Sequence, residues 1–378
     1  MGAQVGVSLT GGGARGAYQA GVLKGLAEIL KEPSEDVPVF NSFSGVSAGA
    51  INVVFMASRL SGFSDAADNL CKLWGQLKPE MIYKTDVVSM GKIGMGWLRD
   101  VTSGSLFKKK VASELLDSSP LGVLLEKNID LSGLRKNIEN RKVVGVACTA
   151  FDYTQRKSIS FVEANESIEG WDRQKRGARL VKLEHQHVLA SCAIPIIFSP
   201  VKVGKDFYGD GSLRNTAPIS PILHLGANKV VFIGVRYENH FNSTRKNFGK
   251  PSVAEIFGTI LNGLFFDTTD VDVERLESYN KIVGQCNEVV MKRPLRKVSY
   301  VYFKPTVDLG ILAEELAAQR LPGIIDYLLK GLGGQAESSE LASYLLFDSV
   351  YTSKLIEIGY EDAYKKKDQV LKMAESNV

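Results

Sequence analysis

Short apolar runs alternate with amphipathic stretches over the first 60 residues of the chain. The run VGVSL at 5–9 carries no charge, which is typical of a strand buried on both faces of a sheet. Between Ala17 and Leu30 apolar residues recur at helical spacing, and the segment KEPSEDVP ends that helix. A second strand is predicted in VFNSFSG, and an almost wholly apolar helix in AGAINVVFMASRL. This alternation predicts an α/β fold with a mostly parallel sheet.

Strand patterns continue to about residue 240 and are then replaced by helical ones. The segments KVVGVACTAFDY and SISFVE predict a pair of strands, DFYGDGS a strand that ends at Asp210, and GANKVVFIGV a further buried strand. We therefore expect a core at 1–240 and a helical C-terminal region at 241–378 that packs on it. Nothing in the pattern divides the chain into two independent domains.

The composition is that of an ordinary globular protein, with 44% hydrophobic and 23% charged residues. The formal net charge of +4 is small for 378 residues and the basic residues are scattered, so no nucleic-acid partner is expected. We find no secretory signal pattern and no apolar run of the ~18 residues that a membrane span requires. The sequence favours a cytoplasmic protein or one bound peripherally to a membrane, and leaves export without a signal peptide open.

The pentapeptide Gly45-Val46-Ser47-Ala48-Gly49 has the G-x-S-x-G pattern and stands between a predicted strand and a predicted helix. In a nucleophile elbow this pattern exposes the serine on a sharp turn, and the small flanking residues allow close backbone contact. Ser47 is therefore a candidate nucleophile, with Gly45 and Gly49 as the elbow glycines. The pentapeptide alone is also compatible with a plain turn.

A serine nucleophile needs a base, which is most often a histidine. None of the four histidines lies in a glycine-flanked loop, and we interpret each as structural: His185, His187, His224 and His240. Asp210-Gly211 by itself indicates only a turn. Because the elbow lacks a plausible histidine, Asp210 becomes the candidate base of a Ser-Asp dyad.

The loop TGGGARGAY begins directly after the first strand, and Gly11, Gly13 and Gly16 match G-x-G-x-x-G. Such a loop could bind a dinucleotide, or its amides could hold the oxyanion of a reaction intermediate. A dinucleotide site would need a carboxylate at the end of the second strand, where the chain has SGVS instead. A P-loop is excluded because no lysine follows Gly16. The pattern favours an oxyanion loop.

Four blocks in this order resemble the patatin-like phospholipase family: GGGARGAYQAGVLKGL, FSGVSAGAINV, ASCAIPIIFSPV and YGDGSLRNTAP. The resemblance covers roughly residues 5–235 and implies a three-layer fold, with a central mostly parallel sheet flanked by helices and a helical C-terminal extension. It implies that Ser47 is the nucleophile and Asp210 its dyad partner. It also assigns the oxyanion loop, which comprises Gly11, Gly12, Gly13 and the basic Arg15. The sequence Asp210-Gly211-Ser212 departs slightly from the family's usual D-G-G or D-G-A.

The resemblance implies a serine lipid acyl hydrolase that cleaves fatty-acyl esters of phospholipids or lysophospholipids, with no metal and no cofactor. An acyltransferase that uses the same acyl-enzyme is the alternative, and a nucleotide-binding module is a remote one. Positional and head-group specificity, oligomeric state and any export to a host stay open.

Two further segments contain residues that suggest a function. The stretch from Met81 to Lys110 is either a lipid-contacting lid or an irregular loop over the core. Its apolar and basic candidates are Met90, Ile93, Met95, Trp97 and Leu98, with Lys92, Arg99 and 108–110. The segment DTTDVDVE at 267–274 lacks the spacing of a calcium loop, so a solvated helix face is expected there.

Overall fold

A computed structural model describes residues 4–30, 38–60, 62–85, 114–215, 218–237, 253–285, 296–321 and 342–375. The strands are β1 (Val5–Leu9), β2 (Ser42–Val46), β3 (Gly145–Asp152), β4 (Lys157–Ala164), β5 (Arg176–Leu180), β6 (Val201–Val203), β7 (Asp206–Asp210), β8 (Lys229–Ile233) and β9 (Ser299–Phe303). The α-helices are α1 (Gly16–Leu30), α2 (Ala48–Ser58), α3 (Phe63–Gly75), α5 (Ser119–Asn128), α6 (Leu131–Glu139), α7 (His185–Ser191), α8 (Ser220–His224), α9 (Val253–Gln285), α10 (Leu309–Arg320), α13 (Ser349–Lys365) and α14 (Lys367–Glu375). The 3-10 helices are η1 (Gly13–Arg15), η2 (Pro79–Met81) and η4 (Gly211–Arg214).

One sheet runs through the molecule in the order β5-β4-β3-β2-β1-β8-β9. The neighbours from β3 to β9 are parallel, as are β4 and β5, whereas β3 and β4 are antiparallel. The hairpin of β6 and β7 joins the sheet through an antiparallel pairing of β7 with β3. The apolar runs form the central strands, because a strand covered on both faces needs apolar side chains on both. The prediction of a mostly parallel sheet is confirmed.

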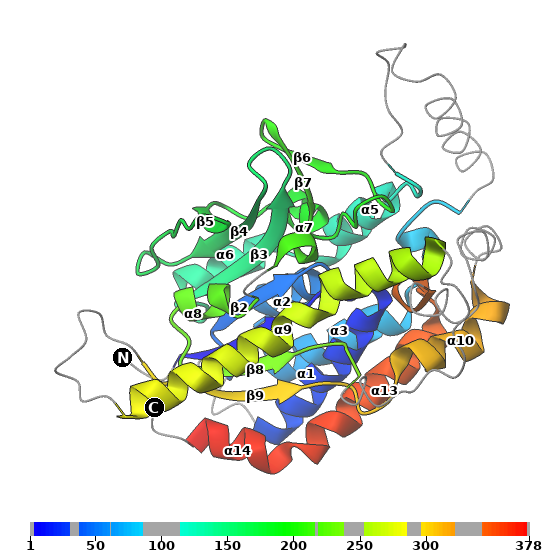
Figure 1. The fold of residues 1–378 in the computed structure, drawn as a ribbon. Coiled ribbons are helices and arrows are strands. Elements are labelled where there is room, and N and C mark those ends of the chain that lie inside the picture. The colour runs from blue at the N-terminus through cyan, green and yellow to red at the C-terminus, as the bar shows by residue number, and fades with distance from the viewer. Residues whose placement is uncertain are drawn as a thin grey trace.

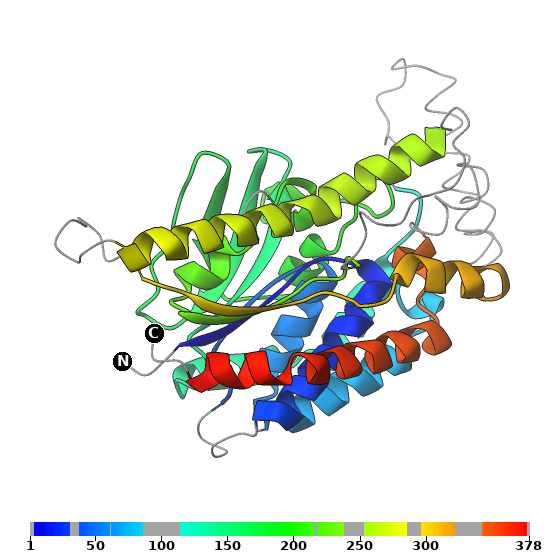
Figure 2. The same cartoon turned by 60° about the horizontal axis from the view of Figure 1, so that its bottom comes forward.

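Helices cover both faces of the sheet, which gives three layers (Figure 1). Figure 2 shows α9 across one face, with α1, α13 and α14 below the opposite one. The larger core, which includes Tyr18, Phe43 and Tyr351, lies on the α1 side. A smaller core on the other side contains Ile222 of α8 and Leu276 of α9. The three-layer architecture expected from the resemblance is confirmed.

The C-terminal region is mostly helical, as expected, and it also supplies one strand. β9 pairs with β8 in parallel, from Lys229 opposite Ser299 to Ile233 opposite Phe303. This strand was not predicted from the sequence. Because residues beyond 240 contribute to the central sheet itself, the region is part of the same hydrophobic structure. The boundary near residue 240 stays a prediction.

Helices α1 and α13 approach each other closely because glycines line their contact. A Cβ on Gly21 would stand 2.0 Å from the carbonyl oxygen of Ile356, and one on Gly359 only 2.1 Å from that of Tyr18. Both distances are far below van der Waals contact, so only glycine fits at either position. The hydroxyl of Tyr18 also donates to Oδ2 of Asp362 over 3.2 Å. The last part of the chain is thus fixed directly to the first helix.

Candidate active site

Ser47 occupies a sharp turn between β2 and α2. Its backbone has φ 54° and ψ −126°, a conformation that residues other than glycine rarely adopt. A Cβ on Gly45 would lie 2.3 Å from the carbonyl oxygen of Gly49, and one on Gly49 would lie 2.5 Å from that of Leu9. The close packing of the turn therefore requires both glycines. The strand-turn-helix context expected of a nucleophile elbow is present.

A serine that sequence analysis did not single out holds this elbow in place. The amide of Ser47 donates to Oγ of Ser191 over 2.9 Å, and the Ser191 hydroxyl donates to the carbonyl of Thr149 over 2.6 Å. Ser191 is fully buried at the end of α7. It links the elbow to β3, which also positions the candidate base. The block ASCAIPIIFSPV contained this residue, but no local pattern indicated its partner.

Asp210 lies at the end of β7, where the pairing of strands brings it to Ser47. β2 runs along one edge of β3 and ends with Val46 opposite Thr149. β7 runs along the same edge in the opposite direction and ends with Asp210 opposite Ala150, the next residue of β3. The two strands therefore meet end to end. This register places the two candidate catalytic residues side by side although 162 residues lie between them in sequence.

The carboxylate of Asp210 is fully buried. Its Oδ1 accepts a hydrogen bond of 2.8 Å from the amide of Ser212. Burial raises the pKa of Asp210 from 3.8 to about 6, although the nearby hydroxyl of Ser47 and the Ser212 amide act to lower it. Oδ2 forms no hydrogen bond of standard geometry with a described residue, although the Ser47 hydroxyl acts on the pKa of the carboxyl. Catalytic hydrogen bonds are often long before substrate binds.

Gly211 allows the close approach that brings Asp210 to this position. A Cβ on Gly211 would stand 2.2 Å from the carbonyl oxygen of Thr149. Ser212 is the next residue, and its amide donates a hydrogen bond to Asp210. The departure of this tripeptide from the family's pattern therefore leaves the carboxylate's backbone partner unchanged.

The glycine loop lies directly against Ser47. A Cβ on Gly11 would be 3.1 Å from Cβ of Ser47 and 2.6 Å from Oγ of Ser212. Gly13 has φ 54°, and a Cβ there would strike the carbonyl oxygen of Tyr344 at 2.4 Å. Among the described residues, the amides of Gly12 and Gly13 have no hydrogen-bond acceptor. These amides are therefore free to bind an anion beside the serine.

Arg15 turns toward the C-terminal part of the chain. It is 3% exposed, its Nε donates to Oγ of Ser343 over 2.8 Å, and its guanidinium lies 4.9 Å from the ring centre of Tyr344. The side chain thus ties the glycine loop to the segment 342–347. A direct role of Arg15 at the oxyanion stays a prediction.

A narrow apolar cavity of about 40 Å³ opens at Ser47 and Gly13. Its wall includes Ile51, Trp74, Leu77, Leu121, Phe198 and Phe347. Phe347 belongs to the C-terminal segment and stacks on Trp74 with 6.5 Å between ring centres. The volume is far below the ~300–1,000 Å³ of typical ligand pockets. An acyl chain can therefore enter only if these side chains move apart.

The three described histidines have other partners. His185 Nε2 lies 3.0 Å from the carbonyl of Ile129, and His187 Nδ1 accepts from the amide of Glu184 at the start of α7. His224 stacks flat on Trp171, with ring centres 4.2 Å apart. These contacts agree with the structural interpretation. His240 lies outside the described residues.

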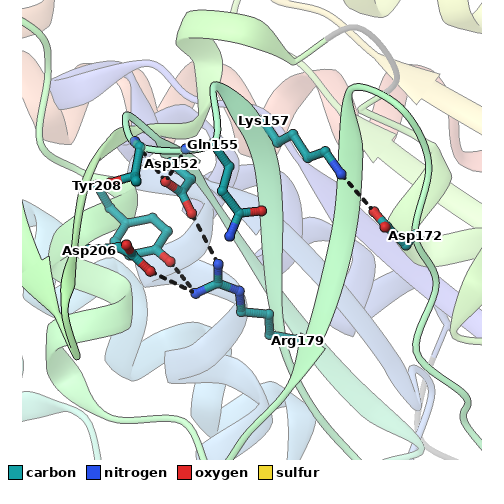
Figure 3. A network of polar contacts seen from close by, with 8 residues as sticks. Asp152, Gln155, Lys157, Asp172, Arg179, Asp206 and Tyr208 are labelled. Carbon is teal, nitrogen blue, oxygen red and sulfur yellow. Dashed lines mark hydrogen bonds and ion pairs between the residues drawn. The ribbon is translucent and has the colours of Figure 1, made fainter.

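An arginine on β5 connects three strands and contacts the first and middle residues of β7 (Figure 3). Arg179 donates to Oδ2 of the fully buried Asp152 on β3 over 3.1 Å. Its other terminal nitrogen donates to the hydroxyl of Tyr208 and lies 3.8 Å from the carboxylate of Asp206, both on β7. Asp210 follows two residues after Tyr208. Arg179 was not predicted from the sequence because its partners come from distant segments.

Other parts of the chain add little to this site. No helix in the described ranges is long and apolar enough to cross a bilayer. Within the same ranges, no group of three or more acidic, histidine or cysteine side chains could hold a metal ion. In the segment considered for calcium, Asp270 pairs with Lys304 and Asp272 accepts from the amide of Ile219. Most of the predicted lid, residues 86–110, lies outside the described residues.

Comparisons with solved structures find distant similarity. VipD from Legionella pneumophila matches at 12% identity with a TM-score of 0.33, over 94% of this chain and 67% of that one. Human GIVD cytosolic phospholipase A2, in complex with methyl gamma-linolenyl fluorophosphonate, matches at 12% identity and a TM-score of 0.45, over 98% of this chain. ExoU in complex with SpcU from Pseudomonas aeruginosa matches at 14% identity and 0.27, over 87% of this chain. This chain spans 59% of the human chain and 60% of the ExoU chain.

No curated protein matches the sequence. The family model for patatin-like phospholipases matches residues 7–223, which is more than half of the chain. This segment contains the glycine loop, the elbow and Asp210, the parts that the strand register brings together. The chain therefore belongs to the patatin-like phospholipase family.

Proposed function

We propose that this protein is a serine lipid acyl hydrolase that cleaves fatty-acyl esters of phospholipids or lysophospholipids. The observation that carries the proposal is the meeting of β2 and β7 along one edge of β3, which puts Ser47 beside a buried carboxylate. The glycine loop and the apolar cavity both border Ser47. Membership of a phospholipase family supports a lipid ester as the substrate.

In the proposed mechanism, Asp210 accepts the hydroxyl proton of Ser47 as Oγ attacks the ester carbonyl carbon. The pKa of about 6 leaves Asp210 mostly ionised at neutral pH while keeping it basic enough to take this proton. The amides of Gly12 and Gly13 would hold the oxyanion, and one such donor contributes about 3 kcal/mol in serine hydrolases. The intermediate collapses, and the departing alcohol takes the proton from Asp210.

The acyl-enzyme is then hydrolysed by the same groups. Asp210 accepts a proton from water, the hydroxide attacks the acyl carbon, and the released Ser47 oxygen recovers the proton. The fatty-acyl chain would lie in the apolar cavity, whose wall of leucine, tryptophan and phenylalanine side chains suits a hydrocarbon. Because this cavity is nearly closed, we infer that contact with lipid at a membrane surface accompanies its opening.

The direct test is incubation with phosphatidylcholine, phosphatidylethanolamine, phosphatidylglycerol and lysophosphatidylcholine, with release of free fatty acid as the measurement. Ser47→Ala should lower the rate by at least about 10³-fold, because no other group replaces the nucleophile. A fluorophosphonate should label the wild type at Ser47 alone. Ser58→Ala is the matched control, because Ser58 is also buried and its hydroxyl donates to the carbonyl of Phe55 in its own helix. Fatty-acid release and labelling that survive in Ser47→Ala would refute the assignment.

A further inference from the structure

A second cavity, of about 550 Å³, lies between α8, α9 and the loop that leads into β5. It shares no lining residue with the cavity at Ser47. Its volume falls within the range of small-molecule binding sites. Its wall includes four arginines, one histidine and one aspartate: Arg173, Arg176, Arg275, Arg296, His224 and Asp272. We call this cavity the arginine pocket.

Within the described part of the chain, the positive charge of the arginine pocket is only partly offset, by Asp272. Asp272 is the one carboxylate in the wall, and its Oδ2 already accepts the amide of Ile219 over 3.0 Å. Among the described residues, none of the four arginines forms an ion pair. Nε of Arg176 is buried and has no hydrogen-bond partner in the described part of the chain. Four guanidinium groups therefore face one carboxylate.

Three of these arginines line the same cavity as His224, and their charges act on its imidazole. Burial, and after it the charges of Arg173, Arg176 and Arg296, together lower the pKa of His224 to about 4. The imidazole is thus neutral at physiological pH and adds no charge. It stacks on Trp171 at an interplanar angle of 5°, which fixes a flat aromatic surface at the pocket. Ile219, Leu276 and Val298 add an apolar part to the wall.

We propose that the arginine pocket binds a phosphomonoester dianion. Guanidinium groups recognise phosphate oxygens in pairs of parallel hydrogen bonds, and a concave basic surface concentrates anions. A phosphomonoester offers nearly two negative charges and three acceptor oxygens, whereas a carboxylate offers one charge and two oxygens. Three arginines in one cavity therefore fit the phosphomonoester better. The apolar part of the wall would contact the organic part of the ligand.

Two sources could supply this group: a soluble phosphate ester or the head group of an anionic lipid. Isothermal titration with glycerol 3-phosphate tests the first source. Co-sedimentation with phosphatidylcholine vesicles, with and without phosphatidic acid, tests the second. Both use the full chain with Ser47→Ala, so that no lipid is consumed. Binding in either assay that depends on the arginines supports the pocket and identifies its source, and absence of binding in both overturns it.

The arginines are tested by Arg176→Gln combined with Arg296→Gln. Loss of the charge-assisted hydrogen bonds should weaken binding by at least about tenfold. Lys281→Gln is the matched control, because it removes one positive charge from an exposed position of α9 outside the pocket. Binding that weakens equally in the control and in the double variant would show attraction to general surface charge and overturn the proposal.

A single substitution at an exposed position tests the pocket in a variant that is expected to fold. Arg173 is exposed, so Arg173→Gln should keep the thermal unfolding temperature while weakening binding about threefold or more. Unchanged affinity in a folded Arg173→Gln would count against the pocket. These assays measure binding alone, so their failure would leave the proposed hydrolase activity untouched.

Discussion

Ser47 and Asp210 both occupy positions that are unfavourable for stability. Ser47 has a backbone conformation that suits glycine, and Asp210 is a carboxylate buried away from water. Neither arrangement is expected of a residue whose only role is structural. The fold keeps them because β2, β7 and α7 hold the surrounding backbone from several directions.

The first prediction is that Asp210→Asn abolishes activity yet stabilises the fold. Asn retains an oxygen for the Ser212 amide but cannot accept the Ser47 proton. The pKa of Asp210 rises from 3.8 in the unfolded chain to about 6 in the folded one, so its protonated form favours folding. This contribution to stability is complete below pH 3.8 and is lost as the pH rises through about 6. The penalty above pH 6 is about 3 kcal/mol at most. Thermal unfolding at pH 7.5 should therefore show a higher melting temperature for the variant.

The same measurement at pH 4.5 provides the control. There the wild-type carboxyl is mostly protonated in the folded state, so the advantage of the variant should shrink. A variant that is less stable than wild type at pH 7.5 would contradict the assigned pKa and its cause.

The second prediction concerns the pH dependence of catalysis. Because Asp210 must be ionised to accept a proton, kcat/KM for a short soluble nitrophenyl ester should rise with pH and level off above about 6. His185→Ala, His187→Ala and His224→Ala should keep that midpoint. A midpoint that moves in one of these folded variants would instead assign the base to a histidine.

Local sequence patterns predicted Ser47, Asp210 and the glycines. The backbone there has unusual dihedral angles or very close contacts, and these restrict the neighbouring residue types. The residues that support the site are not marked by any pattern in the sequence around them. Ser191 acts on Ser47 from 144 residues away, and Phe347 reaches the cavity from the far end of the chain. Only the fold shows these contacts. The catalytic roles of Ser47, Asp210 and the glycine loop stay proposals.

At the scale of elements, strands covered on both faces were predicted and strands at the ends of the sheet were not. β1, β3 and β8 are short apolar runs, which a buried strand requires. β5 has the sequence RGARL and is the last strand in the described order, next to β4, so it needs few apolar side chains. β9 was missed because a five-residue strand, partly exposed, followed a long helical pattern.

The third prediction concerns Arg179, which joins β3, β5 and β7. Arg179→Gln should lower the free energy of unfolding by about 2–3 kcal/mol, because Asp152 would stay buried without its cation. It should also lower kcat with little change in KM, because β7, which ends at Asp210, would lose its contacts with Arg179. Urea unfolding and steady-state kinetics measure the two effects.

Lys157→Gln is the matched control in the same network (Figure 3). Lys157 pairs over 3.1 Å with Asp172, whose side chain is 77% exposed, so its loss should change stability by less than about 0.5 kcal/mol. Adding Asp152→Asn to Arg179→Gln should recover part of the lost stability. Equal stability of the two single variants would show that Arg179 is not a support of the sheet.

For the whole molecule, the family segment at 7–223 is not a self-sufficient unit. β8, β9 and α13 lie beyond it, and they complete the sheet and cover α1. α1 begins where the glycine loop ends. Contacts of the C-terminal region with α1 therefore also help to position the candidate oxyanion site. Contacts of Ser343 and Tyr344 with this loop strengthen the connection.

The fourth prediction tests this connection with two glycines in helices. In Gly21→Ala the new Cβ would lie 2.0 Å from the carbonyl oxygen of Ile356, so α13 must shift. We expect a loss of about 1–3 kcal/mol in stability and slower fluorophosphonate labelling of Ser47. In Gly75→Ala, the matched control, the nearest atom is 3.6 Å away and stability should stay equal or rise by up to about 1 kcal/mol. Equal behaviour of the two variants would mean that the helix contact is not tight.

The pairing of Tyr18 with Asp362 spans 344 residues, and this separation sets a delay during biosynthesis. Translation adds about 5–20 residues per second, so on the order of tens of seconds pass between the appearance of α1 and that of α13. Throughout that interval the glycine face of α1 has no partner helix, and the contacts of the glycine loop with Ser343 and Tyr344 cannot form. The ribosome-bound chain therefore carries its nucleophile long before the surroundings of that nucleophile are complete. If the proposed function holds, hydrolytic competence would then arise only after most of the chain has been made.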